Sequence, residues 1–373
     1  MKTEIIKLNS DKPDIGSIKK AADVVRSGRI VAFPTETVYG LACRVTTQSL
    51  VRLSELKGRD PDKPYTLHIA DKAHLARYVP KRSLREDKLV ANAWPGPLTI
   101  IFDLNASEIS QLRKTLDKQV LRNLYKDNSI GIRCPDNAVA SALLNQADCA
   151  VIAPSANRSG AEAPVTADQV KAVFDGCIEM ILDTGPTKYK QTSTIVKVGK
   201  KGIEILRQGV YSPQQIRDFS TVQVLFVCTG NTCRSPIAQG VFRKTVAEKL
   251  GCPVDQLGQI GYKLKSAGVM GLTGWPASAE AIKVCRHNAI DISAHASSAL
   301  TTELIRESDL IYVMSPAHRQ HLLRLCPDSG SKCFLLADEQ EVPDPIGQDL
   351  DFYEKCFAMI EQAIAKRIGE LNL

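Results

Sequence analysis

The sequence predicts two α/β domains in succession, residues 1–218 and 219–373. Its 373 residues exceed the usual size of a single domain. In both halves short apolar runs end abruptly in polar turns, and in the second half such a turn leads directly into a helical pattern. Hydrophobic residues make up 44% of the chain and charged residues 24%, so each half can bury a core of its own.

Composition narrows the function classes. The eleven cysteines include no Cys-x-x-Cys pair and no Cys/His cluster with zinc spacing, so we expect neither a disulfide scaffold nor a metal site. The first residues, MKTEIIKLNSDKPDIG, lack the apolar core of a signal peptide. No uncharged apolar stretch approaches the roughly 18 residues that a membrane span needs. We therefore expect a cytoplasmic protein with reduced cysteines and no membrane partner.

Charge is distributed unevenly between the two halves. Counting Lys and Arg against Asp and Glu, residues 1–218 carry a net charge of +9 and residues 219–373 a net charge of −2. A basic surface attracts anions such as nucleotide, bicarbonate or RNA. A solvated basic face without a partner would explain the same charge, so this observation alone leaves both interpretations open.

A short helix marks the boundary between the halves. Ser212 has the properties of an N-cap, Pro213 suits the first helical position, and Gln215 completes a capping box. The pattern predicts a helix ending near Phe219. Only STVQ separates that helix from the next apolar run, so the linker is too short for the two domains to drift far apart.

The second half begins with VLFVC, whose continuous apolar run suits a strand buried on both faces of a parallel sheet. The following CTGNTCR is a loop between this strand and a predicted helix starting at SPIAQG. Free backbone N–H groups and the helix dipole make such a loop an anion site. Gly230 permits a tight curve, Arg234 can clamp two phosphate oxygens, and the positive field should lower the pKa of the Cys228 thiol. An inert buried cysteine at a strand end is the alternative.

The stretch VLFVCTGNTCRSPIAQG, followed by SAGV at 266, DLIYVMSPAH at 309 and VPDPIG at 342, resembles the low-molecular-weight protein tyrosine phosphatases over nearly all of residues 222–373. The resemblance implies a Rossmann-like parallel sheet and no cofactor. It implies that Cys228 attacks phosphorus, that Arg234 and the loop amides hold the phosphoryl oxygens, and that Asp344 donates a proton and then activates water. The residues expected to support the loop are Thr229, Gly230, Asn231, Thr232, Cys233 and Ser235.

Two details of that motif bear on the substrate. Thr232 in CTGNTCRS, together with DPIG where tyrosine-specific members commonly carry aromatic residues, is similar to the protein-arginine phosphatase branch. We therefore expect phosphoarginine in a phosphorylated protein as the substrate, with phosphotyrosine as the alternative. Within the loop, Cys233 is a candidate for a protective disulfide with Cys228 and equally for a small packing residue.

A third possibility for this half is a thioredoxin-coupled arsenate reductase, which shares the Cys-x5-Arg loop. Such enzymes need a second pair of cysteines spaced by seven, and Cys326 and Cys333 have that spacing. The pair begins about a dozen residues after Met314, which is too late for that family's redox helix. Cys333 also opens CFLLAD, which has the pattern of a strand.

The first half contains neither Gly-x4-Gly-Lys-Ser/Thr nor Gly-x-Gly-x-x-Gly. It does carry, in order, PTETVYGL, KGRDPDKP, WPGPLT, IRCP, APSANRSG, STIV and LRQG. This series resembles the YrdC/Sua5 family from about residue 10 to residue 217. The resemblance implies a twisted mixed-sheet α/β domain with a basic cleft. It also implies synthesis of threonylcarbamoyl-adenylate from L-threonine, bicarbonate and ATP, feeding the t6A modification of tRNA or its transfer machinery.

The resemblance also implies roles for individual residues. The ATP-binding residues would be Lys57, Arg59, Lys63, Ala153, Ser155, Asn157 and Arg207. The threonine-binding residues would be Thr35, His68, Arg133 and Ser193. Mg²⁺ would accompany ATP, because charge develops on the departing pyrophosphate. KQT stands before STIV where the family has Gly-x-Glu, and lysine stands at 63 where many members have asparagine. A non-catalytic RNA-binding module using the same cleft is the alternative.

Overall fold

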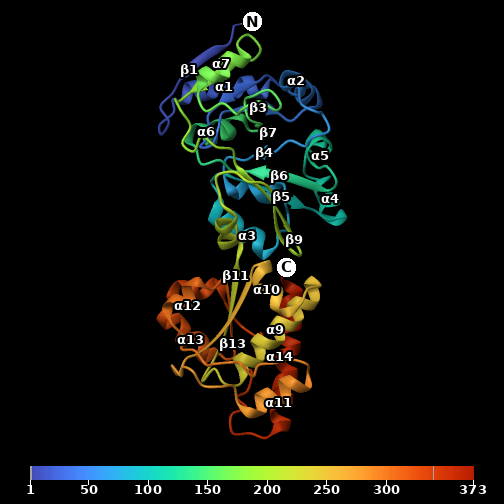
Figure 1. The fold of residues 1–373 in the computed structure, drawn as a ribbon, viewed down its shortest axis with the longest axis vertical. Helices are drawn as coiled ribbons and strands as arrows, with labels where there is room; N and C mark the ends of the chain where they lie inside the picture. The colour runs from blue at the N-terminus through green and yellow to red at the C-terminus, as the bar shows by residue number, and fades with distance from the viewer. Residues whose placement is uncertain (1, 339) are drawn as a thin grey trace. The chain divides into compact units, whose positions relative to one another are not determined.

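The computed structural model describes residues 2–338 and 340–373, and it divides into two compact units (Figure 1). The first unit comprises the chain up to Arg82, Leu89–Gly199 and Ile203–Phe219. The second comprises Ser83–Lys88, Lys200–Gly202 and Ser220–Leu373. None of the helices in these residues is both long enough and apolar enough to cross a membrane.

The first unit is built on one ten-stranded sheet, ordered β1-β8-β2-β3-β7-β4-β6-β5-β9-β10. Its strands are β1 Glu4–Lys7, β2 Val31–Phe33, β3 Gly40–Arg44, β4 Leu67–His68, β5 Leu98–Asp103, β6 Ser129–Arg133, β7 Val151–Ile152, β8 Met180–Asp183, β9 Thr194–Gly199 and β10 Gly202–Arg207. Pairs such as β4 with β6 are parallel, whereas β5 with β6 and β3 with β7 are antiparallel. The expected mixed sheet is therefore confirmed.

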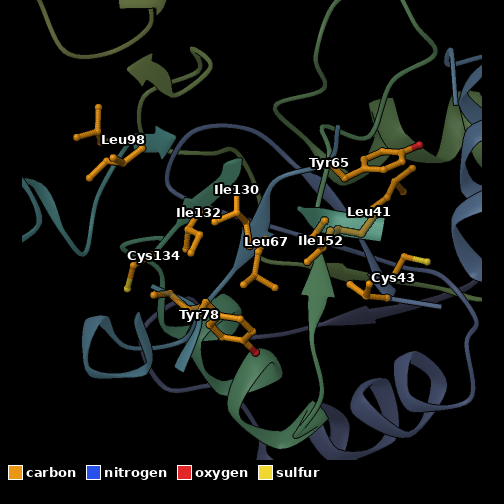
Figure 2. Close-up of a cluster of buried hydrophobic side chains, with 14 of the residues drawn as sticks. Leu41, Cys43, Tyr65, Leu67, Tyr78, Leu98, Ile130, Ile132, Cys134 and Ile152 are labelled. Atoms are coloured by element: carbon orange, nitrogen blue, oxygen red, sulfur yellow. The ribbon is translucent and has the colours of Figure 1, made fainter. Parts of the chain in front are cut away.

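Helices lie over both faces of this sheet. They are α1 Ile15–Arg26, α2 Thr47–Lys57, α3 Leu84–Ala93, α4 Ala106–Leu112, α5 Lys118–Leu124, α6 Ala138–Ala147, α7 Ala167–Phe174 and α8 Pro213–Ser220, with a 3₁₀ turn at Lys72–Arg77. One core joins α1 and α6 to Val31, Phe33 and Val151. The other gathers Leu41, Leu67 and neighbouring strand residues, as Figure 2 shows, under α2, α5 and α7. Alternate residues of the buried strands thus supply two separate cores.

Helix α8 forms at the predicted boundary. The backbone N–H of Ser212 donates to Gln215 Oε1 at 2.9 Å, and the backbone N–H of Gln215 donates to Ser212 Oγ at 3.3 Å. This is the reciprocal pattern of a capping box, with Pro213 at the first helical position. The predicted helix, including its end at the Phe219–Ser220 step, is confirmed.

The second unit contains a four-stranded sheet ordered β12-β11-β13-β14. The strands are β11 Val222–Cys228, β12 Tyr262–Gly268, β13 Leu310–Val313 and β14 Cys333–Leu335. All three neighbouring pairs are parallel, as expected. The central strand β11 is buried along its whole length, which agrees with its uninterrupted apolar sequence.

Two helical layers enclose this sheet. The helices are α9 Arg234–Leu250, α10 Leu257–Ile260, α11 Ala279–His287, α12 Thr302–Glu307, α13 Pro316–Leu325 and α14 Leu350–Glu370, with 3₁₀ turns at Val254–Gln256 and Pro327–Lys332. Figure 1 shows α12 and α13 on one side of β11 and β13, and α9 and α14 on the other. The β11 residues Val224, Phe226 and Cys228 face the α9/α14 core, and Leu225 and Val227 face the α12/α13 core.

Candidate functional sites

The segment Cys228 to Arg234, the phosphate loop, connects the end of β11 to the start of α9. Cys228 is 2% exposed, and its sulfur lies 2.9 Å from Ser235 Oγ. The backbone N–H of Asn231 donates to the same sulfur at 3.2 Å. The loop therefore curls around the thiol, with hydrogen-bond donors directed at it.

Asn231 holds the shape of the phosphate loop. It adopts a left-handed backbone conformation with φ of 56°. Its side-chain amide donates to Ser235 Oγ at 2.8 Å and accepts from the Ser298 backbone N–H at 2.8 Å. His295 Nε2 donates to the Asn231 carbonyl at 2.7 Å. Asn231 and Ser235 were predicted to support the loop, whereas His295 and Ser298 lie about 65 residues away with no spacing pattern that could have indicated them.

The glycine that the loop backbone requires is not the one that the sequence predicted. The sequence predicted that Gly230 provides the tight curve, but the left-handed residue is Asn231, and a Cβ on Gly230 would meet only ordinary contacts at 3.5 Å or more. The demanding position is Gly268, at the end of β12. A Cβ there would lie 2.8 Å from the Thr229 carbonyl oxygen and 2.9 Å from the Asn231 nitrogen. The glycine of SAGV thus allows the loop backbone to pass.

Arg234 connects the loop to a distant segment. Its NH2 group donates to Thr229 Oγ1 at 2.8 Å and forms an ion pair with Asp344, and NH1 donates to the Val342 carbonyl at 3.1 Å. The Arg234 side chain is 4% exposed, whereas that of Asp344 is 39% exposed. The structure therefore brings together Cys228, Arg234 and Asp344, the three residues predicted to be catalytic, with the carboxylate reachable from solvent.

The thiol behaves differently from the prediction. Burial raises the pKa of Cys228 above its usual value, although the Ser235 hydrogen bonds, the Arg234 charge and the Asn231 N–H all act to lower it. The expected lowering of the Cys228 pKa is therefore wrong for this arrangement of the phosphate loop. The sulfur is almost completely removed from water, and this disfavours its anionic form more than the Arg234 charge and the directed donors favour it.

Thr229 belongs to a hydrogen-bonded chain that extends beyond the loop. Because its Oγ1 accepts from Arg234, its hydroxyl proton is free to donate to His318 Nε2 at 3.0 Å. His318 Nδ1 in turn lies 2.9 Å from Ser315 Oγ. Burial and the Arg234 charge lower the pKa of His318 to about 4, so its ring is neutral at pH 7 and can accept that proton. Sequence reasoning did not identify His318.

The other cysteines and Thr232 are placed as follows. Thr232 is half-buried, with Oγ1 at 3.6 Å from Cys233 Sγ. Cys233 Sγ lies 3.2 Å from the Tyr353 hydroxyl, and it is a free thiol like Cys228. Cys326 and Cys333 are buried in the core on the opposite face of β11 from Cys228.

In the first unit, the strand register assembles a polar row. His68 of β4 pairs with Arg133 of β6, which pairs with Thr99 of β5. Directly paired residues project from the same face of a sheet, so these three side chains are neighbours. Ser193, just before β9, places its hydroxyl 3.2 Å from that of Thr99. Three of the four predicted threonine-binding residues therefore lie in one group.

The fourth, Thr35, reaches this group through the turn that follows β2. Arg133 NH2 donates to Thr37 Oγ1 at 2.7 Å and to Glu36 Oε1 at 2.8 Å. The Thr35 and Thr37 hydroxyl oxygens are 2.8 Å apart. Sequence reasoning missed Glu36 and Thr37, although both lie within PTETVYGL. The sequence could have indicated them, because both directly follow the predicted threonine-binding residue Thr35 just after a buried strand.

Burial and the nearby Arg133 charge determine the protonation of this group. Burial and the Arg133 charge lower the pKa of His68 to about 3, so the ring is neutral and its Nδ1–H can donate to the Thr66 carbonyl at 3.2 Å. Arg207 NH2 donates to the Ser193 carbonyl at 2.8 Å. Burial and the Arg133 charge also lower the pKa of Arg207. Arg207, which the sequence assigned to ATP, therefore lies with the residues predicted to bind L-threonine.

The structure does not bring all the predicted ATP-binding residues into one hydrogen-bonded group. Lys57, at the end of α2, donates to the Ser155 and Asn157 carbonyls, both at 2.5 Å, in the turn after Ala153. Burial and the Arg59 charge lower the pKa of Lys57 to about 8. The Arg59 guanidinium lies over the Tyr65 ring at 4.8 Å from its centroid. Lys63, by contrast, is exposed and makes only a backbone turn with Asp60 among the described contacts.

No group of three or more His, Cys, Asp or Glu residues that could hold a metal ion occurs within residues 2–338 and 340–373.

Fold and sites thus define a chain of two α/β units. One has a loop closed around a thiol, and the other has a polar site on a mixed sheet. Residues 23–209 match the Sua5_yciO_yrdC family, described as telomere recombination, and residues 223–372 match the low molecular weight phosphotyrosine protein phosphatase family. The chain therefore belongs to the Sua5/YciO/YrdC family in its N-terminal part and to the low-molecular-weight phosphatase family in its C-terminal part.

Individual relatives cover one part or the other. Threonylcarbamoyl-AMP synthases of Bacillus subtilis and Pyrococcus abyssi are 34% and 35% identical over 56% and 52% of this chain, which spans 57% and 54% of their lengths. The chain thus covers little more than half of these relatives. The phosphatase Etp of Escherichia coli is 35% identical over 39% of this chain and 94% of its own length. Pyrococcus abyssi Sua5 complexed with L-threonine shares the fold, with a TM-score of 0.52, 22% identity and coverage of 71% of this chain and 92% of that one.

Proposed function

We propose that the chain is a bifunctional enzyme. Its N-terminal unit makes L-threonylcarbamoyladenylate from L-threonine, bicarbonate and ATP, releases pyrophosphate, and supplies the t6A modification of tRNA. Its C-terminal unit dephosphorylates proteins through a phosphocysteine intermediate, with phosphoarginine as the substrate group. Because ATP and tRNA are cytoplasmic substrates, the cytoplasm is the compartment in which we propose that it acts.

The observation that best supports the synthase proposal is that separate strand ends converge on one polar site. Four segments contribute hydrogen-bonded side chains to this site. Arg133 donates to Glu36 and Thr37, and Arg207 donates to Ser193. Arg133 is suited to the carboxylate of threonine, since a guanidinium can bind both oxygens. No covalent nucleophile is required, because positioning and charge stabilisation can promote attack on the α-phosphorus.

Cations would stabilise the departing pyrophosphate. Lys57, Arg59 and Arg207 are the candidates in the first unit, and Lys57 already holds the turn of Ser155 and Asn157 in place. Mg²⁺ commonly binds through substrate phosphate oxygens and waters with one or two carboxylates. It would therefore enter with ATP and neutralise charge on the phosphates.

The observation that best supports the phosphatase proposal is that Cys228, Arg234 and Asp344 lie together at the phosphate loop. As Arg234 leaves Asp344 to hold the phosphoryl oxygens, the Cys228 thiol would give its proton to the freed Asp344 carboxylate. The resulting thiolate would attack phosphorus while the bond from phosphorus to the leaving group breaks. As Asp344 is released from this ion pair and protonated, it can donate a proton to the leaving group and later take one from water. The Ser235 hydroxyl and the Asn231 N–H, both directed at the sulfur, would stabilise its anionic form as the leaving thiolate.

Thr232 supports phosphoarginine as the substrate. Thr232 is a half-buried residue of the phosphate loop, and its hydroxyl can accept a hydrogen bond from a guanidino N–H. The test is a comparison of kcat/KM for phosphoarginine, phosphotyrosine and phosphoserine substrates. A preference for phosphotyrosine would replace the phosphoarginine proposal. Arsenate reduction is not favoured, because Cys326 and Cys333 lie on the other face of the sheet from Cys228.

The synthase proposal has an equally direct test. The full chain should release pyrophosphate from ATP only when L-threonine and bicarbonate are both present. Binding of RNA without any such release would instead assign the first unit as a non-catalytic RNA-binding module.

A further inference from the structure

Two charged side chains of the polar site in the first unit each have an atom left without a partner. Glu36 and Arg133 form an ion pair whose side chains are only 1% and 7% exposed. Among the buried side-chain atoms of the described residues, Glu36 Oε2 and Arg133 Nε make no hydrogen bond. Buried charged groups ordinarily use most of their hydrogen-bonding capacity. Two such atoms of opposite charge in one pair therefore indicate a ligand that carries both charges.

The geometry of the pair supports this interpretation. Arginine and carboxylate commonly pair through two parallel hydrogen bonds that use both carboxylate oxygens. Here Arg133 NH2 contacts only Oε1 of Glu36 and shares itself with Thr37 Oγ1. Glu36 Oε2 consequently remains available to a donor outside the protein. The other cation of this group, Arg207, is engaged with the carbonyl and hydroxyl of Ser193, and no described contact joins it to that oxygen.

We propose that Glu36 is a catalytic residue that binds the α-ammonium group of the amino-acid substrate through Oε2 and accepts its proton, while Arg133 faces the substrate carboxylate. The inference rests on the proposed synthase function and extends it. An α-amino acid is a zwitterion, so its two charged groups match the two unpartnered atoms. The proposed function assigns Arg133 to the carboxylate of threonine but leaves its ammonium group without a partner.

The proton transfer is the step that makes the amine a nucleophile. The carboxylate of Glu36 takes one proton from the ammonium group, which becomes a neutral amine with a free electron pair. The amine nitrogen then forms a bond to the carbon of bicarbonate. One C–O bond of bicarbonate breaks, and the leaving oxygen takes a proton from the nitrogen and departs as water. The product is the N-carboxylate of the amino acid, and Glu36 returns its proton to solvent.

The main test replaces Glu36 by its neutral isostere. Glu36→Gln keeps an acceptor for Arg133 NH2 but cannot take a proton. Forward pyrophosphate release should fall by about 10²-fold or more, the typical scale of general-base catalysis. The deficit should shrink as pH rises, because solvent then deprotonates the amine. The reverse reaction, in which threonylcarbamoyladenylate and pyrophosphate form ATP, starts from a carbamate nitrogen without an ammonium charge and should stay within about threefold of wild type.

The matched control is Glu204→Gln, which makes the same change at an exposed position of β10 and should leave both directions unaltered. Equal losses of forward and reverse activity in Glu36→Gln, or no loss of either, would overturn the inference. If the wild-type chain itself releases no pyrophosphate, the proposed synthase function fails, and the ligand measurement described next still tests Glu36.

Ligand-induced thermal stabilisation of the wild-type chain does not depend on the variant folding. L-Threonine should raise the Tm, because a ligand that binds only the folded state stabilises it. 3-Hydroxybutanoate, which keeps the carboxylate and the hydroxyl but lacks the amine, should raise it at least tenfold less at equal concentration. An equal rise with both compounds would exclude an ammonium site at Glu36, and so would an undiminished rise with L-threonine in folded Glu36→Gln.

Discussion

Each unit of this chain contains one arginine–carboxylate pair at its site, and the two pairs differ in exposure. In the second unit the carboxylate of Asp344 is 39% exposed, whereas in the first unit that of Glu36 is 1% exposed. A carboxylate open to solvent can meet a leaving group and then a water molecule. An enclosed carboxylate is reached chiefly by a ligand that binds beside it. An arginine–carboxylate pair is therefore suited to hydrolysis where the carboxylate is exposed, and to selection of a charged substrate where it is enclosed.

The two sites also differ in how they are assembled. The phosphate loop places its sulfur, its directed N–H group and its arginine within seven consecutive residues, between β11 and α9. The first unit draws its polar row from β4, β5 and β6 and adds a turn after β2 and a residue before β9. A substitution in the loop should therefore affect one reaction alone, and a substitution in a strand row should affect binding of several groups together.

The largest expected effect separates the two units. Cys228→Ser should abolish phosphatase turnover, because a serine hydroxyl is a much weaker nucleophile than a cysteine sulfur and gives up its proton far less readily. Pyrophosphate release by the first unit should remain close to wild type. Both rates are measured on the same preparation. Phosphatase activity that survived in the variant would remove Cys228 from the mechanism, and a parallel loss of pyrophosphate release would mean that the two units do not act separately.

The next effect tests the exposed carboxylate. Asp344→Asn should slow dephosphorylation by about 10²–10⁴-fold, the usual contribution of general acid–base catalysis. The loss should be greatest for substrates with poor leaving groups, since they need the proton most. Asp338→Asn, which alters the ion pairs of Asp338 with Lys366 and Arg367 and leaves the phosphate loop unchanged, serves as the control. A small and uniform loss across leaving groups would assign Asp344 to positioning Arg234 only.

A smaller effect is expected from the buried cation of the first unit. Lys57→Met should lower pyrophosphate release about 10²-fold, comparable to the loss of one directed donor at a developing charge. Phosphatase activity should persist. An unaltered synthase rate would contradict a role of Lys57 at the phosphates.

The lowered pKa of Lys57 predicts that stability and synthase activity depend on pH. Burial and Arg59 lower its pKa to about 8 from 10.5, so the folded protein loses this charge as pH rises through about 8. Between pH of about 8 and 10.5 the unfolded chain binds more protons at Lys57 than the folded protein does, so the free energy of unfolding rises with pH over this range. Below about pH 8 the buried charge of Lys57 destabilises the folded protein. Synthase activity should decline above pH 8 in wild type. Lys57→Arg, whose charge does not titrate there, should lack that decline.

The smallest effect concerns selectivity. Thr232→Ile should lower kcat/KM for phosphoarginine relative to phosphotyrosine, because an apolar wall leaves a guanidino N–H unpaired. An unpaired buried donor costs about 1–3 kcal/mol. At tenfold per 1.36 kcal/mol this corresponds to roughly 5- to 150-fold in the ratio. Thr232→Ser keeps the hydroxyl and should keep the ratio. If Thr232→Ile left the ratio unchanged, another residue would determine selectivity.

Sequence reasoning performed differently at the two sites. It identified β11, the start of α9 and the loop residues directly, because a strand, a loop and a helix that follow each other in the chain carry their pattern in adjacent letters. It misjudged the roles within the loop, where Asn231 rather than Gly230 has the left-handed backbone and Gly268 makes the close approach. Those contacts depend on β12, which is about 35 residues away from the loop.

The sequence by itself determined the class of each unit, the capping box at Ser212, the mixed and parallel character of the two sheets through the family resemblance, and the residues of the phosphate loop. Only the tertiary structure decided the two ion pairs, Arg234 with Asp344 and Arg133 with Glu36, and the raised thiol pKa of Cys228. The physical reason is that burial and the pairing of charges arise when distant segments close on one another. Neither the loss of water around a side chain nor the carboxylate opposite an arginine is a property of neighbouring residues in the chain.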